Sequence, residues 1–155
     1  MKKQGGTTVM GSEAIAWPIG KIALAVDGSE PSKRAGHLTR ELAKALGAEV
    51  VVLHFRESAI TRYGEPAGYE TADETAAIVR EAAEELAAAG VTVAADVAAV
   101  RPFGEASEIA AEADRLQAQL IVVGSRGLST GRAVLQGSVS HDLIHTANGP
   151  VLVVH

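Results

Sequence analysis

The segment Lys21–Phe55, KIALAVDGSEPSKRAGHLTRELAKALGAEVVVLHF, contains a complete strand–helix–strand unit. Residues 22–26, IALAV, form a short aliphatic run that ends at a glycine-containing turn, as a buried strand does. Pro31 lies where the first turn of a helix tolerates proline, and apolar residues then recur at helical spacing until Gly47. The valine-rich residues 49–55 read as a second strand. Two buried strands joined by a helix predict parallel pairing with a right-handed crossover.

The rest of the chain repeats this alternation. Further helices are predicted at 71–89, 105–117 and 138–146, and further strands at 91–100, 119–124 and 151–154. The third strand is less apolar than the others, which is typical of a strand near a sheet edge. Residues 56–70 show no clear period and are interpreted as a long loop. The fold class is therefore α/β, a single doubly wound five-stranded parallel sheet with helices on both faces.

Composition limits the function classes. The chain has 155 residues, 47% of them hydrophobic, which suits one globular domain, and we expect a flexible extension at 1–20 followed by a domain at 21–155. The net charge of -5 argues against a nucleic-acid partner, because phosphate backbones require clustered basic residues. No apolar run reaches the roughly 20 residues of a membrane span, so no membrane partner and a cytoplasmic location are expected. The absence of cysteine excludes disulfides and thiolate metal sites.

The predicted topology points to one edge of the sheet as a ligand site. In doubly wound sheets, ligands bind beyond the carboxyl ends of the strands, at the point where the strand order reverses. Asp27, Phe55, Arg101 and Gly124 all follow predicted strands closely. They are candidates for ligand contact on position alone.

The segment Gly124–Ser140, GSRGLSTGRAVLQGSVS, is rich in glycine and hydroxyl side chains. Gly124 and Gly127 leave a strand, and Gly137-Ser138 opens a helix whose first N–H groups could bind an anion. Two arginines in the segment could add positive charge. The alternative is that the glycines form turns and Ser138 caps the helix. The chain has neither the phosphate-binding G-x-x-x-x-G-K-[ST] loop nor a G-x-G-x-x-G after a strand.

The spacing Gly124-x2-Gly127-x9-Gly137-Ser138 resembles the signature of the ATP-binding type of universal stress protein. IALAVDGSEPS at 22–32 is similar to the start of domains of the same family, and GPVLVV at 149–154 is similar to their end. The resemblance covers residues 21–155. It implies an adenine nucleotide alpha hydrolase-like, Rossmann-like domain.

The resemblance also implies a set of cofactor-binding residues. Asp27 would contact the nucleoside, and the backbone at Ala25 and Phe55 would line the adenine pocket. The positions that would bind phosphate are Gly124, Gly127, Gly137, Ser138, Val139 and Ser140. From the residues themselves, Asp27 could instead form a turn with the residues after it, and Phe55 could simply pack at a strand end. Arg101 could reach the phosphates or point to solvent.

The function implied by the resemblance is that of an ATP-binding, nucleotide-dependent regulator in the stress response. ATP with Mg²⁺ or Mn²⁺ would be the cofactor, and a homodimer would form through the final strand, Val151–Val154. Two alternatives stay open, an interaction scaffold with a vestigial pocket and a slow ATP hydrolase, although no positioned catalytic residue is evident. His141 and His145 share a helix face, but no third ligand is evident, so no protein metal site is expected.

Overall fold

A computed structural model describes residues 18–57, 71–101, 104–125 and 139–155. In chain order the elements are β1 (Lys21–Ala25), α1 (Glu30–Leu46), β2 (Glu49–Glu57), α2 (Ala72–Ala88), β3 (Val93–Arg101), α3 (Glu105–Arg115), β4 (Leu120–Gly124), α4 (Val139–Thr146) and β5 (Val151–Val154). The alternation of strands and helices predicted from the sequence is confirmed.

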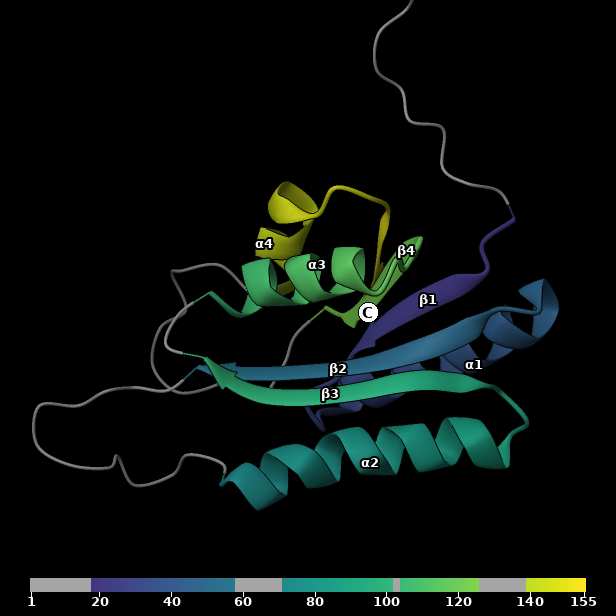
Figure 1. Ribbon diagram of the computed structural model, residues 1–155, viewed down its shortest axis with the longest axis horizontal. Helices are drawn as coiled ribbons and strands as arrows, with labels where there is room; N and C mark the ends of the chain where they lie inside the picture. The colour runs from purple at the N-terminus through teal and green to yellow at the C-terminus, as the bar shows by residue number, and fades with distance from the viewer. Residues whose placement is uncertain (1–17, 58–70, 102–103, 126–138) are drawn as a thin grey trace, which may run out of the picture.

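The five strands form one parallel sheet in the order β3-β2-β1-β4-β5 (Figure 1). The chain first builds outward from β1 through β2 to β3, and then crosses to the other side of β1 to add β4 and β5. The strand order therefore reverses between β1 and β4, which is the topological switch point of the sheet. β3 lies at an edge, as its less apolar sequence predicted.

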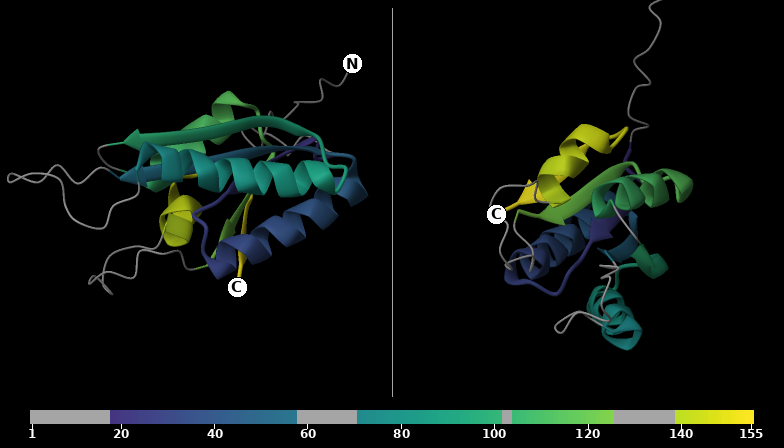
Figure 2. Two further views of the ribbon diagram at one scale, coloured as in Figure 1. Left: turned by 90° about the horizontal axis from the view of Figure 1, so that it is seen from below. Right: turned by 90° about the vertical axis from the view of Figure 1, so that its left-hand side faces the viewer.

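Side chains alternate between two apolar layers. Ile22 and Leu24 of β1 point to one face, where they pack with residues of α1 and α2. Ala23 and Ala25 point to the opposite face, where α3 and α4 complete a second cluster. The right-hand view of Figure 2 shows the sheet between these two pairs of helices. Because both faces are covered, the inner strands are apolar along almost their whole length, as the sequence indicated.

Local sequence explains how the helices begin and end. The Ser29 side chain accepts a hydrogen bond from the Ser32 N–H at the start of α1, and Gly47 ends that helix with a left-handed φ of 66°. At the start of α2, Thr71 and Glu74 form a reciprocal capping box. Of these features, Gly47 is the helix end that the sequence predicted.

Several element boundaries differ from the prediction by one or two residues. β2 continues to Glu57, so the segment predicted as a loop from residue 56 begins later, and residues 58–70 lie outside the described part. α3 ends at Arg115, two residues early, and the φ of 59° at Gln117 reverses the chain toward β4. Residues 1–17 of the expected extension also lie outside the described part, whereas Ile19 packs into the core.

Candidate functional site

The carboxyl ends of β2, β1 and β4 lie side by side at the switch point. Ala25, the last residue of β1, pairs with Leu53 of β2 on one side and with Val123 of β4 on the other. Ala25 is 5% exposed, and its side chain belongs to the apolar cluster under α3 and α4. Because this side chain is buried, a ligand at the edge could contact only the backbone of Ala25 and the turn that follows it.

The turn after β1 is held by the carboxylate of Asp27. Its Oδ1 accepts hydrogen bonds from the Ser29 N–H at 2.9 Å and from the Ser29 hydroxyl at 2.6 Å. This is the turn arrangement considered for Asp27 from the sequence, and it fixes the carboxylate at the carboxyl edge of the sheet. A nucleoside role for Asp27 would therefore use a side chain that the fold already orients.

Ser32 completes this turn, and sequence reasoning missed it. Its hydroxyl accepts a hydrogen bond from the Asp27 N–H at 3.1 Å, while its own N–H donates to the Ser29 hydroxyl at 3.3 Å. Ser32 is 5% exposed, so these bonds satisfy polar groups in a buried position. The pair of serines three residues apart, in SEPS, was the available signal.

Gly124 allows the end of β4 to approach the start of α1. A Cβ at this position would lie 2.7 Å from the Pro31 carbonyl carbon and 2.8 Å from the Ser32 nitrogen, closer than van der Waals contact allows. The first turn of α1 is thus brought directly against the carboxyl end of β4. Since the N-terminus of a helix carries partial positive charge, this contact makes the switch point favourable for an anion.

The first turn of α4 lies at the same edge. Val139 begins the helix and packs against the α3–α4 cluster. Ser140 is 5% exposed, and its hydroxyl donates to the Ser125 carbonyl at 3.3 Å, which joins the helix start to the residue after β4. The structure therefore brings Ser140 to Ser125, the residue that follows Gly124.

Two side chains at the end of β2 face opposite layers. Phe55 is 3% exposed and packs in the cluster under α3 and α4, so its side chain takes the packing role considered from the sequence. Arg56 follows it, and its buried Nε has no hydrogen-bond partner among the described residues. Sequence reasoning assigned Arg56 to a loop and missed it. A buried guanidinium nitrogen at this edge is a donor that an anionic group could satisfy.

The remaining predicted positions are only partly covered. Gly127, Gly137 and Ser138 lie outside the described residues, as does the side chain of Arg101. The rings of His141 and His145 on α4 have centroids 4.8 Å apart, and their planes are tilted by 59°. Within the described ranges, no group of three potential ligands could hold a metal ion. In that same part of the chain, no helix has the length and apolarity needed to cross a bilayer.

Comparison with known proteins agrees with this architecture. The family model of the universal stress protein family matches residues 18–155. The universal stress protein YxiE of Bacillus subtilis is 33% identical over 147 residues, covering 86% of this chain and 97% of that protein. A universal stress protein of Thermus aquaticus is 36% identical over 136 residues, covering 86% and 96%. A solved universal stress protein structure in complex with cAMP has a TM-score of 0.65 and 27% identity, covering 88% of this chain and 97% of that one.

Proposed function

Because this chain belongs to the universal stress protein family, we propose that it binds an adenine nucleotide at the carboxyl edge of β1 and β4. The observation that carries the proposal is that the N-termini of α1 and α4 both lie at this edge. Gly124 contacts the first turn of α1, and Ser125 is bonded to the first turn of α4. Two helix N-termini at one switch point suit a phosphate group. The related structure in complex with cAMP supports adenine nucleotides as the ligand class.

In this proposal, different residues bind the nucleoside and the phosphates of the nucleotide. The Asp27 carboxylate accepts hydrogen bonds from the nucleoside, beside the backbone of Ala25 and Phe55. Gly124, Val139 and Ser140 act with Gly127, Gly137 and Ser138 on the phosphates. Arg56 adds a guanidinium at the neighbouring strand end, where its buried Nε can donate to an anionic group. This positive contribution matters in a chain whose net charge is -5.

We propose ATP as the nucleotide that regulates the protein, accompanied by Mg²⁺ or Mn²⁺. The cation would be held by phosphate oxygens and water, since the described residues offer no protein cage for it. ATP that contacts both the β1–α1 turn and the β4–α4 connection would favour one arrangement of this edge over others. Such a shift would make the protein a nucleotide-dependent regulator of the stress response in the cytoplasm.

The proposal is tested by isothermal titration calorimetry of the full chain with ATP, AMP and cAMP. The Asp27→Asn variant keeps an oxygen that can accept from Ser29, but it loses the negative charge and one acceptor. We expect its nucleotide affinity to fall about 10- to 100-fold, because hydrogen bonds to charged groups are the stronger ones. Release of ADP in the same samples would measure hydrolysis.

The matched control is Asp73→Asn, which removes an exposed carboxylate from α2 and should leave nucleotide affinity unchanged. Circular dichroism of each variant shows whether the fold is retained. Absence of binding to all three nucleotides at millimolar concentration would refute the proposal. Equal affinity in the Asp27→Asn variant and the unaltered protein would refute the role given to Asp27.

A further inference from the structure

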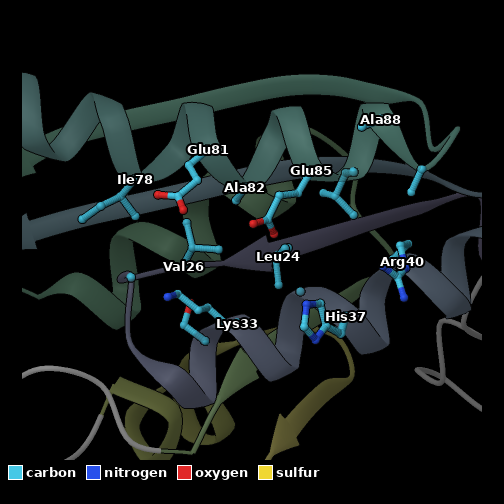
Figure 3. Close-up of a pocket in the computed structure, with 15 residues that line it drawn as sticks. Leu24, Val26, Lys33, His37, Arg40, Ile78, Glu81, Ala82, Glu85 and Ala88 are labelled. Atoms are coloured by element: carbon cyan, nitrogen blue, oxygen red, sulfur yellow. The ribbon is translucent and has the colours of Figure 1, made fainter.

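A cavity of about 400 Å³ lies between α1 and α2, above β1 (Figure 3). It lies on the face of the sheet, whereas the nucleotide site proposed above lies at the carboxyl edge. Only Gly28 and Ser32, at the β1–α1 turn, belong to both regions. The volume is within the range of about 300–1,000 Å³ that is usual for small-molecule sites. We call this cavity the α1–α2 groove.

The floor of the groove is apolar. Leu24 of β1 and Val26, just after that strand, form its base, and Ile78 and Leu86 of α2 form part of one wall. The groove stays open partly because small residues line the facing helices, of which Gly36 on α1 is the clearest case. A Cβ built at Gly36 would only reach ordinary contact with Leu24, at 3.8 Å, so the backbone is not closely packed here. The floor therefore offers apolar contact to a ligand with an apolar body.

Two rows of opposite charge border this floor. Lys33, His37 and Arg40 recur at helical spacing along one face of α1, and Glu81 and Glu85 lie one turn apart on α2. In Figure 3 the carboxylates of α2 point toward the groove from one side and the α1 row lines the other side.

The two rows are not joined to each other. Lys33 pairs with Glu30 at 3.4 Å and Arg40 with Glu41 at 2.8 Å, both on α1 itself. Among the residues that the structure describes, no ion pair crosses the groove from α1 to α2. Because the two pairs on α1 are exposed and therefore weak, Lys33 and Arg40 can still attract an anionic group in the groove. In the described part of the chain, no side chain of α1 pairs with Glu81 or Glu85, whose carboxylates can attract a cationic group.

From this arrangement we propose that the α1–α2 groove binds a compact zwitterion with an apolar body. Its anionic group would face Lys33 and Arg40, its cationic group would face Glu81 and Glu85, and its apolar part would cover the floor. A purely anionic ligand would be repelled by the α2 row, and a purely cationic one by the α1 row. An uncharged apolar ligand would cover the charged rows without pairing them. Only a ligand that carries both charges complements both walls.

The probe is the dipeptide leucyl-leucine, which carries an ammonium, a carboxylate and two apolar side chains. It is titrated into the ¹⁵N-labelled full chain and followed by NMR chemical shifts. We expect saturable shifts in α1 and α2 that persist in the presence of saturating ATP. N-acetyl-leucyl-leucine and leucyl-leucine amide each lack one charge, and each should bind about fivefold more weakly, as expected for partly exposed charge pairs.

Variants assign the binding to the groove. Neutralising one wall with Glu81→Gln and Glu85→Gln should weaken the dipeptide about fivefold and remove its preference over the acetylated form. The control Glu84→Gln lies on the same helix but does not line the groove, so affinity should not change. Ala82→Leu, which extends an apolar side chain into the groove and leaves every charge in place, should abolish binding.

Three results would overturn the proposal. The first is the absence of saturable shifts at millimolar dipeptide in unaltered, folded protein. The second is equal affinity for the dipeptide and its two singly charged derivatives. The third is displacement of the dipeptide by ATP, which would place it in the nucleotide site instead.

Discussion

At the scale of single residues, the carboxyl edge depends on positions that serve the fold first. Asp27 orients its carboxylate by accepting two hydrogen bonds from Ser29. Position 124 needs glycine because the backbone of α1 leaves no room for a Cβ there, whether or not a ligand binds. A substitution at either position is therefore expected to change the stability of the fold as well as any ligand binding. Binding and stability must therefore be measured separately at these positions.

Gly124→Ala should destabilise the protein by about 1–3 kcal/mol, the usual cost of inserting a methyl group into a closely packed region. The added Cβ would meet backbone atoms of Pro31 and Ser32 at 2.7–2.8 Å, and backbone cannot rotate away as a side chain can. Urea denaturation gives the free energy of unfolding.

Gly149→Ala is the matched control for this substitution, because nothing lies within 4 Å of a Cβ built there. Its free energy of unfolding should stay within about 0.5 kcal/mol of the unaltered protein, as for most surface substitutions. Equal stability of the two variants would show that β4 and α1 do not approach as closely as described.

At the scale of elements, α2 depends on its first turn for a defined start. The Thr71 N–H donates to Glu74 Oε2 at 2.6 Å, and the Glu74 N–H donates to the Thr71 hydroxyl at 3.2 Å. The hydrogen bond from the Thr71 backbone, followed by that from its side chain, lowers the pKa of Glu74 below its ordinary value of 4.5. The capping box is therefore strongest when Glu74 is ionised.

This pKa shift predicts a pH dependence of the α2 N-terminus. A carboxyl group with a lowered pKa in the folded state contributes stability that is fully present above pH 4.5 and is lost as the pH falls through the folded-state value. Amide hydrogen exchange of residues 71–75 can be followed by NMR from pH 6 to pH 3 and corrected for the intrinsic effect of pH on the exchange rate. We expect the corrected exchange to show more frequent local opening of these residues as the pH is lowered.

Glu74→Gln serves as the comparison, because glutamine can keep the hydrogen bond of the capping box but does not ionise. Opening of residues 71–75 in this variant should lose the acid-dependent component. The same acid-dependent opening in Glu74→Gln would mean that another group controls the start of α2.

The element scale also shows what the sequence could predict. Strands such as VVV at 50–52 are continuously apolar because they are covered on both faces, and this made them recognisable. The last two residues of β2 were missed, because Arg56 and Glu57 are charged residues that continue the strand beyond the predicted end at Phe55.

For the candidate site, the carboxyl edge was predicted from the alternation of strands and helices, and the family from the spacing of the glycines after residue 123. The contact of Gly124 with α1 could not, because it joins residues 124 and 31, which are distant in sequence. The α1–α2 groove was missed for the same reason. Lys33 and Glu81 each look like an ordinary solvated helix residue until two separate helices are placed side by side.

At the scale of the whole molecule, β5 is an edge strand, and no other strand of the described residues pairs with its outer side. The carbonyls of Pro150 and Val154 accept hydrogen bonds from the β4 side. Because alternate residues of a parallel strand bond the same neighbour, the N–H groups of Val151 and Val153 point away from β4. We propose that a second copy of the chain pairs there, as expected for a homodimer through this strand.

Val153→Pro should convert this dimer to monomer, because it removes an outward N–H group that could bond the partner. Sedimentation velocity at several concentrations measures the change. Val153→Thr keeps the N–H and nearly the same shape, so it should remain dimeric. A monomeric unaltered protein, or a dimeric Val153→Pro variant that keeps its fold, would exclude this interface.

The strand order also bears on how the chain reaches its native state. β1, β2 and β3 are neighbours in both sequence and space, so pairing among these strands closes shorter segments of chain than the pairing of β1 with β4 does. β4 must instead find the opposite side of β1, where Val123 pairs with Ala25. Contacts of such long sequence separation are slow to form. During synthesis, the nascent chain would therefore expose one side of its central strand until β4 has left the ribosome, and the proposed nucleotide site would exist only after the start of α4 has followed.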